Sequence, residues 1–337
     1  MKRLIVCLLV TGFLGIMAFR KSVRVYYSVP EGWPQPVYDF TKNPPDQEKM
    51  ALGRRLFYDP ILSRDSTISC ASCHLSFTAF AHTDHDLSHG IDGRIGTRNA
   101  PALMNLAWHS SFMWDGAINH LDMQPLAPIS DSTEMHEDIG RVLAKLQSTD
   151  RYPGLFYKAF GDSTIKTAHL LKSLSQFMLM LVSAHSKYDQ VKRGADNFND
   201  QETRGYRLFQ QHCAACHTEP LFTNGGFENN GLPPDETLGD PGRMRVTGDS
   251  GDYLKFKVPT LRNIALSYPY MHDGRFKTLN QVLNHYIRGI QPNPTLNPKL
   301  QHGIPLGSND KADLIAFLLT LTDQSFVRDT SLAFIRE

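Results

Sequence analysis

The sequence lacks both an excess of charge and any segment that resembles a convincing β-sheet. Its 35 lysine and arginine residues nearly balance 34 aspartate and glutamate residues, for a formal net charge of +1 with histidine neutral. Nucleic-acid binding relies on excess positive charge, so this balance removes the electrostatic case for such a partner. Hydrophobic residues make up 41% of the 337 residues, which excludes a disordered or fibrous chain and favours about two domains.

Cysteine is scarce, yet its positions are informative. Four of the five cysteines fall in two copies of one pattern, Cys70-Ala71-Ser72-Cys73-His74 and Cys213-Ala214-Ala215-Cys216-His217. A redox disulfide needs neither the histidine nor a second copy, and no βαβ pattern surrounds either motif. A zinc site needs four ligands near one another, whereas the two motifs lie far apart in the sequence. Covalent attachment of c-type haem is the explanation that remains.

The C-x-x-C-H spacing suits haem attachment for a geometric reason. Residues i and i+3 share one face of a helical turn, so both thiols reach the two vinyl groups on one porphyrin edge. The histidine that follows brings its imidazole to the iron. We therefore predict two covalent haem c groups, one per domain. The attachment cysteines are Cys70, Cys73, Cys213 and Cys216, and the proximal iron ligands are His74 and His217.

The N-terminus has the pattern of an export segment. Lys2 and Arg3 precede an apolar run over residues 4–19, and Arg20-Lys21 closes it. The run is shorter than the roughly 20 residues of a membrane span, and no clean cleavage site follows it. We expect residues 1–21 to be an export signal, either cleaved or retained as an N-terminal membrane anchor. Either outcome places the body of the protein outside the cytoplasm, in the periplasm.

The rest of the chain predicts a mainly α-helical protein. Hydrophobic residues recur at helical spacing over residues 46–58, 138–147, 164–188, 200–209, 279–287 and 310–321. The segment 75–134 has poor periodicity, and long irregular segments of this kind are usually functional. We expect two tandem cytochrome c-like haem domains, residues 22–190 and 199–337, with long loops at their interface.

Several ordered motifs outside the haem sites carry a resemblance to a known family. In the first half they are Gly96-Thr97-Arg98-Asn99-Ala100-Pro101, Trp114-Asp115-Gly116, Gln124, Pro128 and Glu134-Met135. In the second half they are Val258-Pro259-Thr260-Leu261-Arg262-Asn263 and Pro269-Tyr270-Met271-His272-Asp273-Gly274. Over residues 46–322 the chain resembles the bacterial di-haem cytochrome c peroxidases and their relatives that mature methylamine dehydrogenase. The resemblance implies that hydrogen peroxide is cleaved at the N-terminal haem, and that a small cytochrome c or cupredoxin donates electrons at the C-terminal haem.

The resemblance also assigns roles to three residues near the first haem. Glu134 and Gln124 match the two polar residues at its open face, where a carboxylate can move a proton between the peroxide oxygens and an amide can position the oxidant. Trp114 matches a tryptophan that lies between the haems and can be oxidised during electron transfer. The residues alone favour simpler explanations, namely a solvated Glu134 near a helix start and a Trp114 packed in a core.

The resemblance further places a calcium ion between the domains. Asn99 and the backbone carbonyls of Lys257 and Pro259 match its position. Oxygen ligands suit this ion, but three are too few unless water molecules complete the shell. We therefore expect Ca²⁺ at this place, with water among its ligands.

The distal ligand of the first haem has more than one candidate. His89, which stands in a His-Gly pair before the Arg98-Asn99 motif, fits the position that the family's peroxidases use. His82 and His85 lie within reach in the sequence, and an open or water-bound iron is a further alternative. A histidine here must leave before peroxide binds, so activity would depend on prior reduction.

The second haem departs from the pattern of the peroxidases. Those proteins place a methionine on its distal side, whereas counting along the corresponding helix of this chain reaches Tyr286. Tyrosine at this position resembles the branch that matures methylamine dehydrogenase. Methionine raises a haem potential, and an anionic oxygen lowers it by stabilising the ferric state. His285 and Met271 are the rival ligands.

Three functions follow from these residues. The leading hypothesis is a periplasmic peroxidase that reduces hydrogen peroxide to water with electrons from a small redox protein. The second, which Tyr286 favours, is long-range oxidation of a protein substrate through a high-valent pair of haems. The third is a non-enzymatic di-haem electron carrier. The sequence leaves open whether the chain forms a homodimer.

Overall fold

The computed structural model describes residues 27–334, so the predicted export segment 1–21 lies outside the described residues. The first group of helices is α1 (Gln47–Tyr58), α2 (Cys70–Cys73), α3 (Leu126–Ser130), α4 (Ile139–Gln147), α5 (Tyr152–Phe160) and α6 (Thr167–Leu179). The second is α7 (Lys187–Lys192), α8 (Asp200–His212), α9 (Met244–Thr247), α10 (Leu279–Asn284), α11 (Ser308–Leu319) and α12 (Gln324–Val327). Two short strands, β1 (Phe227–Glu228) and β2 (Phe256–Lys257), pair antiparallel.

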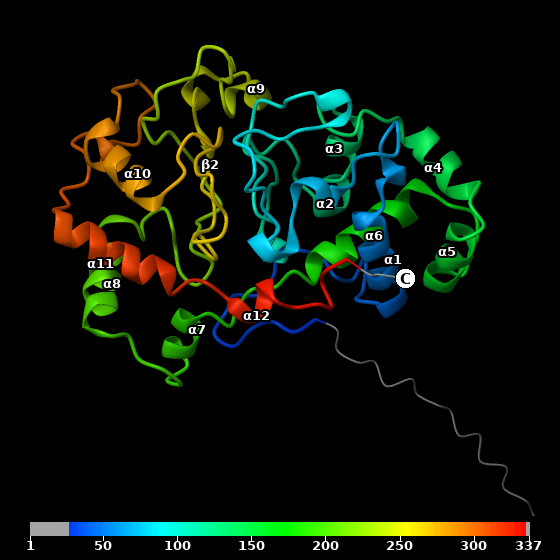
Figure 1. The fold of residues 1–337 in the computed structure, drawn as a ribbon, viewed down its shortest axis with the longest axis horizontal. Helices are drawn as coiled ribbons and strands as arrows, with labels where there is room; N and C mark the ends of the chain where they lie inside the picture. Colours follow the sequence, from blue (N-terminus) through cyan, green and yellow to red (C-terminus); the bar gives the residue numbers. More distant parts are fainter. Residues whose placement is uncertain (1–26, 335–337) are drawn as a thin grey trace, which may run out of the picture.

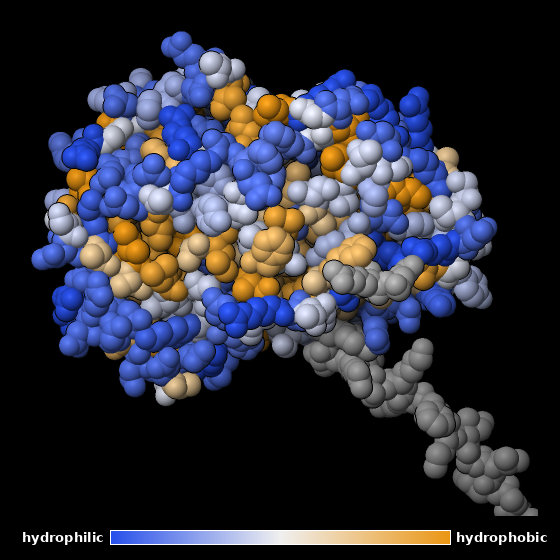
Figure 2. Space-filling model, viewed as in Figure 1, coloured by the Kyte–Doolittle hydropathy of each residue, from blue (hydrophilic) through white to orange (hydrophobic). Residues whose placement is uncertain are grey.

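The helices form two lobes that lie side by side (Figure 1). One lobe holds α1 to α6 and the other holds α8 to α11, while α7 and α12 lie near the junction between them. Apolar residues gather in a band across the middle of the face shown in Figure 2, over both lobes. Among residues 27–334, none of the helices combines the length and apolarity that a membrane span requires. The prediction of a mainly helical protein with two tandem domains is confirmed.

The helix predicted over residues 164–188 is shorter in the structure, because α6 ends at Leu179. The chain beyond it runs alongside Asn105, whose backbone N–H donates to the Leu181 carbonyl at 2.7 Å. The side-chain oxygen of Asn105 accepts from the Ser183 N–H at 2.9 Å. These bonds satisfy backbone groups outside a helix, a tertiary effect that helical periodicity does not reveal.

In each lobe two helices cross at a glycine. Gly53 of α1 packs against Ser173 of α6, where a Cβ atom on the glycine would lie 1.8 Å from the Ser173 carbonyl oxygen. Gly205 of α8 packs in the same way against Asp313 of α11, with a corresponding distance of 1.9 Å. A methyl group fits at neither crossing, so glycine allows the close approach of both helix pairs.

Three buried phenylalanines fill the core beside each crossing. Their ring centroids lie 5.1 to 6.2 Å apart in the first lobe and 5.1 to 6.3 Å apart in the second. Aromatic pairs at such distances stabilise a core beyond the area they bury. The two lobes therefore share one packing pattern, made by Phe57, Phe80 and Phe177 in the first and by Phe209, Phe222 and Phe317 in the second.

A buried arginine ties the lobes together. Arg262 is fully buried and donates two hydrogen bonds, of 2.8 and 2.9 Å, to the carboxylate of Asp189 in α7. Its guanidinium lies 4.5 Å from the ring centroid of Trp33, which packs against the first core. Tyr188 packs in the second core, whereas Phe326 of α12 packs in the first. The chain thus crosses between the lobes more than once, and the predicted domain boundaries stay predictions.

The glycine crossings lead to a stability prediction. Gly53→Ala and Gly205→Ala each push a methyl group into a backbone carbonyl, so we expect each to lower the free energy of unfolding by about 1–3 kcal/mol or more. Gly154→Ala is the matched control, since nothing lies within 4 Å of its added methyl in α5. Thermal unfolding of the three variants checks this. Melting temperatures of the Gly53 and Gly205 variants equal to that of the Gly154 variant would contradict the crossing model.

Candidate functional site

The first C-x-x-C-H motif lies on the short helix α2. Cys70 and Cys73 form the ends of this helix, and the Ser72 hydroxyl accepts a hydrogen bond of 3.1 Å from the Ser69 N–H at its N-terminus. The helix lines a cavity with about 550 Å³ of space free of protein atoms, part of it open to solvent. Apolar side chains, including Leu103, Leu174 and Met178, form part of its wall.

Both motif histidines are held by backbone carbonyls. The Nδ1 atom of His74 lies 2.8 Å from the Phe80 carbonyl oxygen, and Nδ1 of His217 lies 3.1 Å from both the Phe222 and Pro259 carbonyl oxygens. A carbonyl can only accept, so Nδ1 carries the hydrogen and Nε2 keeps its lone pair. Burial lowers the pKa of His74 to about 4 and also lowers that of His217. Both rings are therefore neutral and free to bind iron through Nε2.

The carbonyls that hold the two rings have the same unusual backbone. Phe80 and Phe222 adopt φ angles of 58° and 55°, in the left-handed region that residues other than glycine seldom occupy. Burial of their rings in the two cores offsets the cost of this conformation. Core packing thus directs each carbonyl at its histidine.

The cysteines have the chemistry of haem attachment. All four motif cysteines are free thiols. Burial raises the pKa of Cys70 to about 12, of Cys73 to about 11 and of Cys213 to about 12. A thioether forms by addition of a thiol to a vinyl group. These protonated thiols, next to a neutral imidazole, fit a covalent haem c in each lobe.

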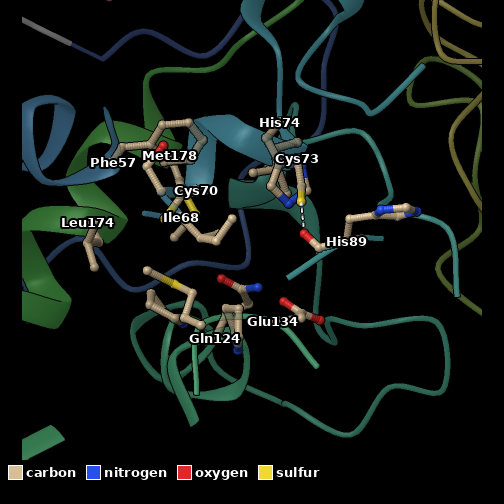
Figure 3. A pocket seen from close by; sticks show the side chains of 15 residues that line it. Phe57, Ile68, Cys70, Cys73, His74, His89, Gln124, Glu134, Leu174 and Met178 are labelled. Carbon is tan, nitrogen blue, oxygen red and sulfur yellow. Dashed lines mark hydrogen bonds between the residues drawn. The ribbon is translucent and has the colours of Figure 1, made fainter. Parts of the chain in front are cut away.

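Glu134 and Gln124 face the cavity from the side opposite α2 (Figure 3). Burial, together with the smaller effect of the nearby Asp131 carboxylate, raises the pKa of Glu134 to about 7. The Gln124 amide nitrogen lies 3.9 Å from the Met113 sulfur. The structure thus brings together the two polar residues singled out in the sequence, on one wall of a largely apolar cavity. Their roles stay predictions.

Gly90 is a residue of this site that sequence reasoning missed. A Cβ atom there would lie 2.1 Å from the Thr133 carbonyl oxygen and 2.4 Å from that of Glu134. The next residue, Ile91, donates its N–H to the Glu134 carbonyl at 2.9 Å. The loop around Gly90 therefore holds the backbone of Glu134 in place. In the sequence only the His89-Gly90 pair points to this position, and it predicts an iron ligand at His89 rather than a role for Gly90.

The imidazole of His89 stacks on His85, with ring centroids 4.2 Å apart. In Figure 3 the ring points away from the space between Cys70 and Gln124. Its backbone carbonyl accepts from the Cys73 thiol at 3.6 Å, so the residue still borders the cavity. Coordination of iron by His89 would require the ring to turn, and the distal ligand stays a prediction.

Trp114 contacts residues of both lobes. Its indole Nε1–H donates to the Asn99 carbonyl at 2.8 Å, and its own carbonyl accepts from the Lys257 N–H at 2.7 Å. Nearby, Arg98 pairs with Asp115 at 2.6 Å in the first lobe and with Asp240 at 2.6 Å in the second. The ring therefore lies in a junction fixed by hydrogen bonds and ion pairs.

The residues predicted to bind calcium lie at the same junction. The Asn99 side-chain nitrogen donates to the Asp86 carbonyl at 2.8 Å, and the Pro259 carbonyl accepts from His217. The Lys257 amine lies 2.8 Å from Nδ1 of His109, and burial lowers its pKa to about 8. Among the described residues, no group of three or more His, Cys, Asp or Glu side chains is arranged to hold a metal. That finding does not bear on carbonyl ligands, so calcium stays a prediction.

The second site has a different distal side. Tyr286 lies on a π-helical turn, His285–Gly289, that continues α10. Its hydroxyl lies 3.4 Å from the side-chain nitrogen of Asn230, and burial raises its pKa. The same nitrogen lies 3.5 Å from the Met271 sulfur. His285 is a rival candidate ligand. Its Nε2 atom donates to the Asn230 backbone carbonyl at 3.1 Å, so this nitrogen is already engaged in a hydrogen bond.

Two family models match the chain. The model described as di-haem cytochrome c peroxidase matches residues 47–197, and the model described as cytochrome c matches residues 202–322. Each match contains one of the C-x-x-C-H motifs. The order of the two models agrees with the order of the two lobes in the structure.

Curated relatives and a solved structure extend these matches over most of the chain. Cytochrome c551 peroxidase of Nitrosomonas europaea is 36% identical, over 86% of this chain and 84% of that protein. Methylamine utilization protein MauG of Methylorubrum extorquens is 33% identical, over 89% and 84%. The crystal structure of a MauG-like protein associated with microbial copper homeostasis superposes with a TM-score of 0.82 at 31% identity, covering 91% of this chain and 98% of that one. The chain therefore belongs to the di-haem cytochrome c peroxidase family and carries two covalent haem c groups.

Proposed function

We propose that Glu134 and Gln124 drive the reduction of hydrogen peroxide to water at the first site, with electrons that enter at the second. Family membership makes the chain a haem peroxidase, an oxidoreductase that acts on peroxide with a redox partner. The observation that carries the residue assignment is the position of Glu134 and Gln124 on the cavity wall that faces Cys70, Cys73 and His74.

The two motifs supply everything that haem attachment requires. The proposed thioethers form at Cys70 and Cys73 in the first lobe and at Cys213 and Cys216 in the second, with Nε2 of His74 and of His217 as iron ligands. When bound, the haems supply the iron that takes peroxide and the means to exchange single electrons. The carbonyls of Phe80 and Phe222 hold the two imidazoles through Nδ1, which would leave each Nε2 free to bind haem iron.

Glu134 is the proposed proton carrier. Its carboxylate takes a proton from one peroxide oxygen and gives it to the other, which leaves as water as the O–O bond breaks. Two electrons and two further protons complete the conversion of one peroxide into two waters. A pKa of about 7 suits a group that must both accept and return a proton near neutral pH. The Gln124 amide can donate a hydrogen bond to peroxide without exchanging a proton, so it orients the oxidant.

Trp114 is the proposed relay between the sites. Its ring lies in the junction of the lobes, and its hydrogen bonds to Asn99 and Lys257 fix it relative to both. An indole can be oxidised by one electron more easily than an aliphatic side chain, which suits a relay. The proposed Ca²⁺ site at Asn99, Lys257 and Pro259 would stiffen the same junction.

The proposal extends to the electron donor and the location of the protein. We propose a small cytochrome c or a cupredoxin as the donor, docking near the second site, since the relatives include a cytochrome c551 peroxidase. The N-terminal pattern supports export to the periplasm, with residues 1–21 cleaved or retained as an anchor. A homodimer stays a prediction.

One observation favours a second function. Tyr286, rather than a methionine, lies near the second cysteine pair, and a relative is the methylamine utilization protein MauG. An anionic oxygen ligand lowers a haem potential and favours an oxidised second site. The second function is accordingly oxidation of a protein substrate at a distance, in which the substrate protein supplies the electrons.

The mechanism predicts that Glu134→Gln removes most of the activity. Without a proton carrier, we expect kcat/KM for peroxide to fall by about 10²–10⁴-fold. The wild-type rate should rise with pH around 7, as the Glu134 carboxyl ionises, and the variant should lose this rise. Steady-state turnover with a reduced donor protein checks both, with exposed Glu48→Gln as the control. Turnover and pH dependence that match those of the control would exclude Glu134 from the mechanism.

The relay predicts a separate defect in Trp114→Phe. The variant keeps an aromatic ring but loses the indole and its bond to Asn99, so electron transfer between the haems should slow while haem content is kept. Trp108→Phe is a matched control, because it loses an equivalent bond, of 2.7 Å, to the Pro34 carbonyl. Stopped-flow measurement of interhaem electron transfer compares them. Equal rates in the two variants would remove Trp114 from the electron path.

A further inference from the structure

The side chain of Asn230 lies at the centre of the second distal site. Its nitrogen contacts the hydroxyl of Tyr286 at 3.4 Å and the sulfur of Met271 at 3.5 Å. Its backbone carbonyl accepts from His285 Nε2 at 3.1 Å. Three candidate ligands of the second haem, which come from two distant segments of the chain, therefore converge on one asparagine.

The orientation of the Asn230 amide follows from its other contact. The Leu232 backbone N–H donates to the side-chain oxygen of Asn230 at 3.2 Å. A backbone N–H can only donate, so this atom must be the oxygen and the NH₂ group must face Tyr286 and Met271. The amide has two hydrogens for these two acceptors. The phenolic oxygen of Tyr286 is thus a hydrogen-bond acceptor from Asn230.

Both residues that Asn230 contacts stand on unusual backbone. Met271 has a φ angle of 75°, and its carbonyl accepts from Gly274 at 3.3 Å in a tight turn. Tyr286 lies on the π-helical turn after α10. Left-handed non-glycine residues and π-helical turns both concentrate at functional sites. The left-handed residue Met271 and the π-helical turn with Tyr286 thus bring a thioether and a phenol to the same amide.

We propose that Asn230 selects the distal ligand of the second haem: its amide favours Tyr286 as the ligand by donating to the phenol oxygen, and by donating to the Met271 sulfur it holds back a rival ligand that replaces Tyr286 when the amide is lost. The inference rests on the proposed function, since it takes Tyr286 as the ligand. An anionic oxygen stabilises ferric iron, and a thioether raises the potential. Asn230 is therefore a positioning residue for the potential of the site that receives electrons.

The test compares neutral variants that lack the donor. Asn230→Ser keeps an oxygen for the Leu232 N–H but is too short to reach Tyr286, and Asn230→Leu keeps the size without the donor. We expect both to lose the tyrosinate signature in low-temperature electron paramagnetic resonance. The potential of the second haem should rise by at least about 59 mV, a tenfold loss of preference for the ferric form. Asn293→Ser is the matched control, since its oxygen accepts from the Thr295 N–H at 3.1 Å.

Two further variants separate the possible failures. Adding Met271→Leu to Asn230→Ser should remove the replacement ligand and let the reduced second haem bind carbon monoxide. Spectra and potentials of the Asn230 variants that match those of Asn293→Ser would overturn the inference. So would a double variant whose haem is indistinguishable from that of Asn230→Ser. Tyr286→Phe tests the assumption that Tyr286 is the ligand. If the spectrum of this variant equals that of the wild type, Tyr286 is not a ligand, and it is the proposed function that fails.

Discussion

The geometry of both haem sites depends on one interaction, the hydrogen bond between a backbone carbonyl and the Nδ1 atom of each motif histidine. It leaves Nε2 free for iron, and it exists because Phe80 and Phe222 turn their carbonyls toward the imidazoles from a left-handed backbone. Their rings are anchored in cores made possible by the glycine crossings at Gly53 and Gly205. In both lobes, helix packing thus anchors the phenylalanine whose left-handed backbone orients the proposed iron ligand.

The two lobes differ where the chemistry differs. Opposite His74 the fold presents Glu134, whose pKa of about 7 comes mainly from burial, together with the neutral amide of Gln124. In the second lobe it presents Tyr286 and Met271 around Asn230. One scaffold thus places the proposed proton carrier in one lobe and the proposed ligand of the second haem in the other. Trp114 lies in the junction between the lobes.

Sequence alone predicted the features that local spacing encodes. The two C-x-x-C-H motifs, the helical class and α1, α4 and α8 follow from short-range patterns. The early end of α6 does not, because it depends on Asn105, far away in the sequence. The shared glycine and phenylalanine pattern was missed because Gly53 and Gly205 stand at different separations from their cysteines. Asn230 carries no local signal at all, since its partners Met271 and Tyr286 are brought to it by tertiary folding.

The central claim is that each lobe presents two thiols and one oriented imidazole to a covalently bound porphyrin. Pyridine haemochrome analysis of the purified protein, with the intact mass of the same sample, tests this. The account predicts two haem c groups per polypeptide, with mass added at both cysteine pairs. One haem or none per polypeptide would contradict it.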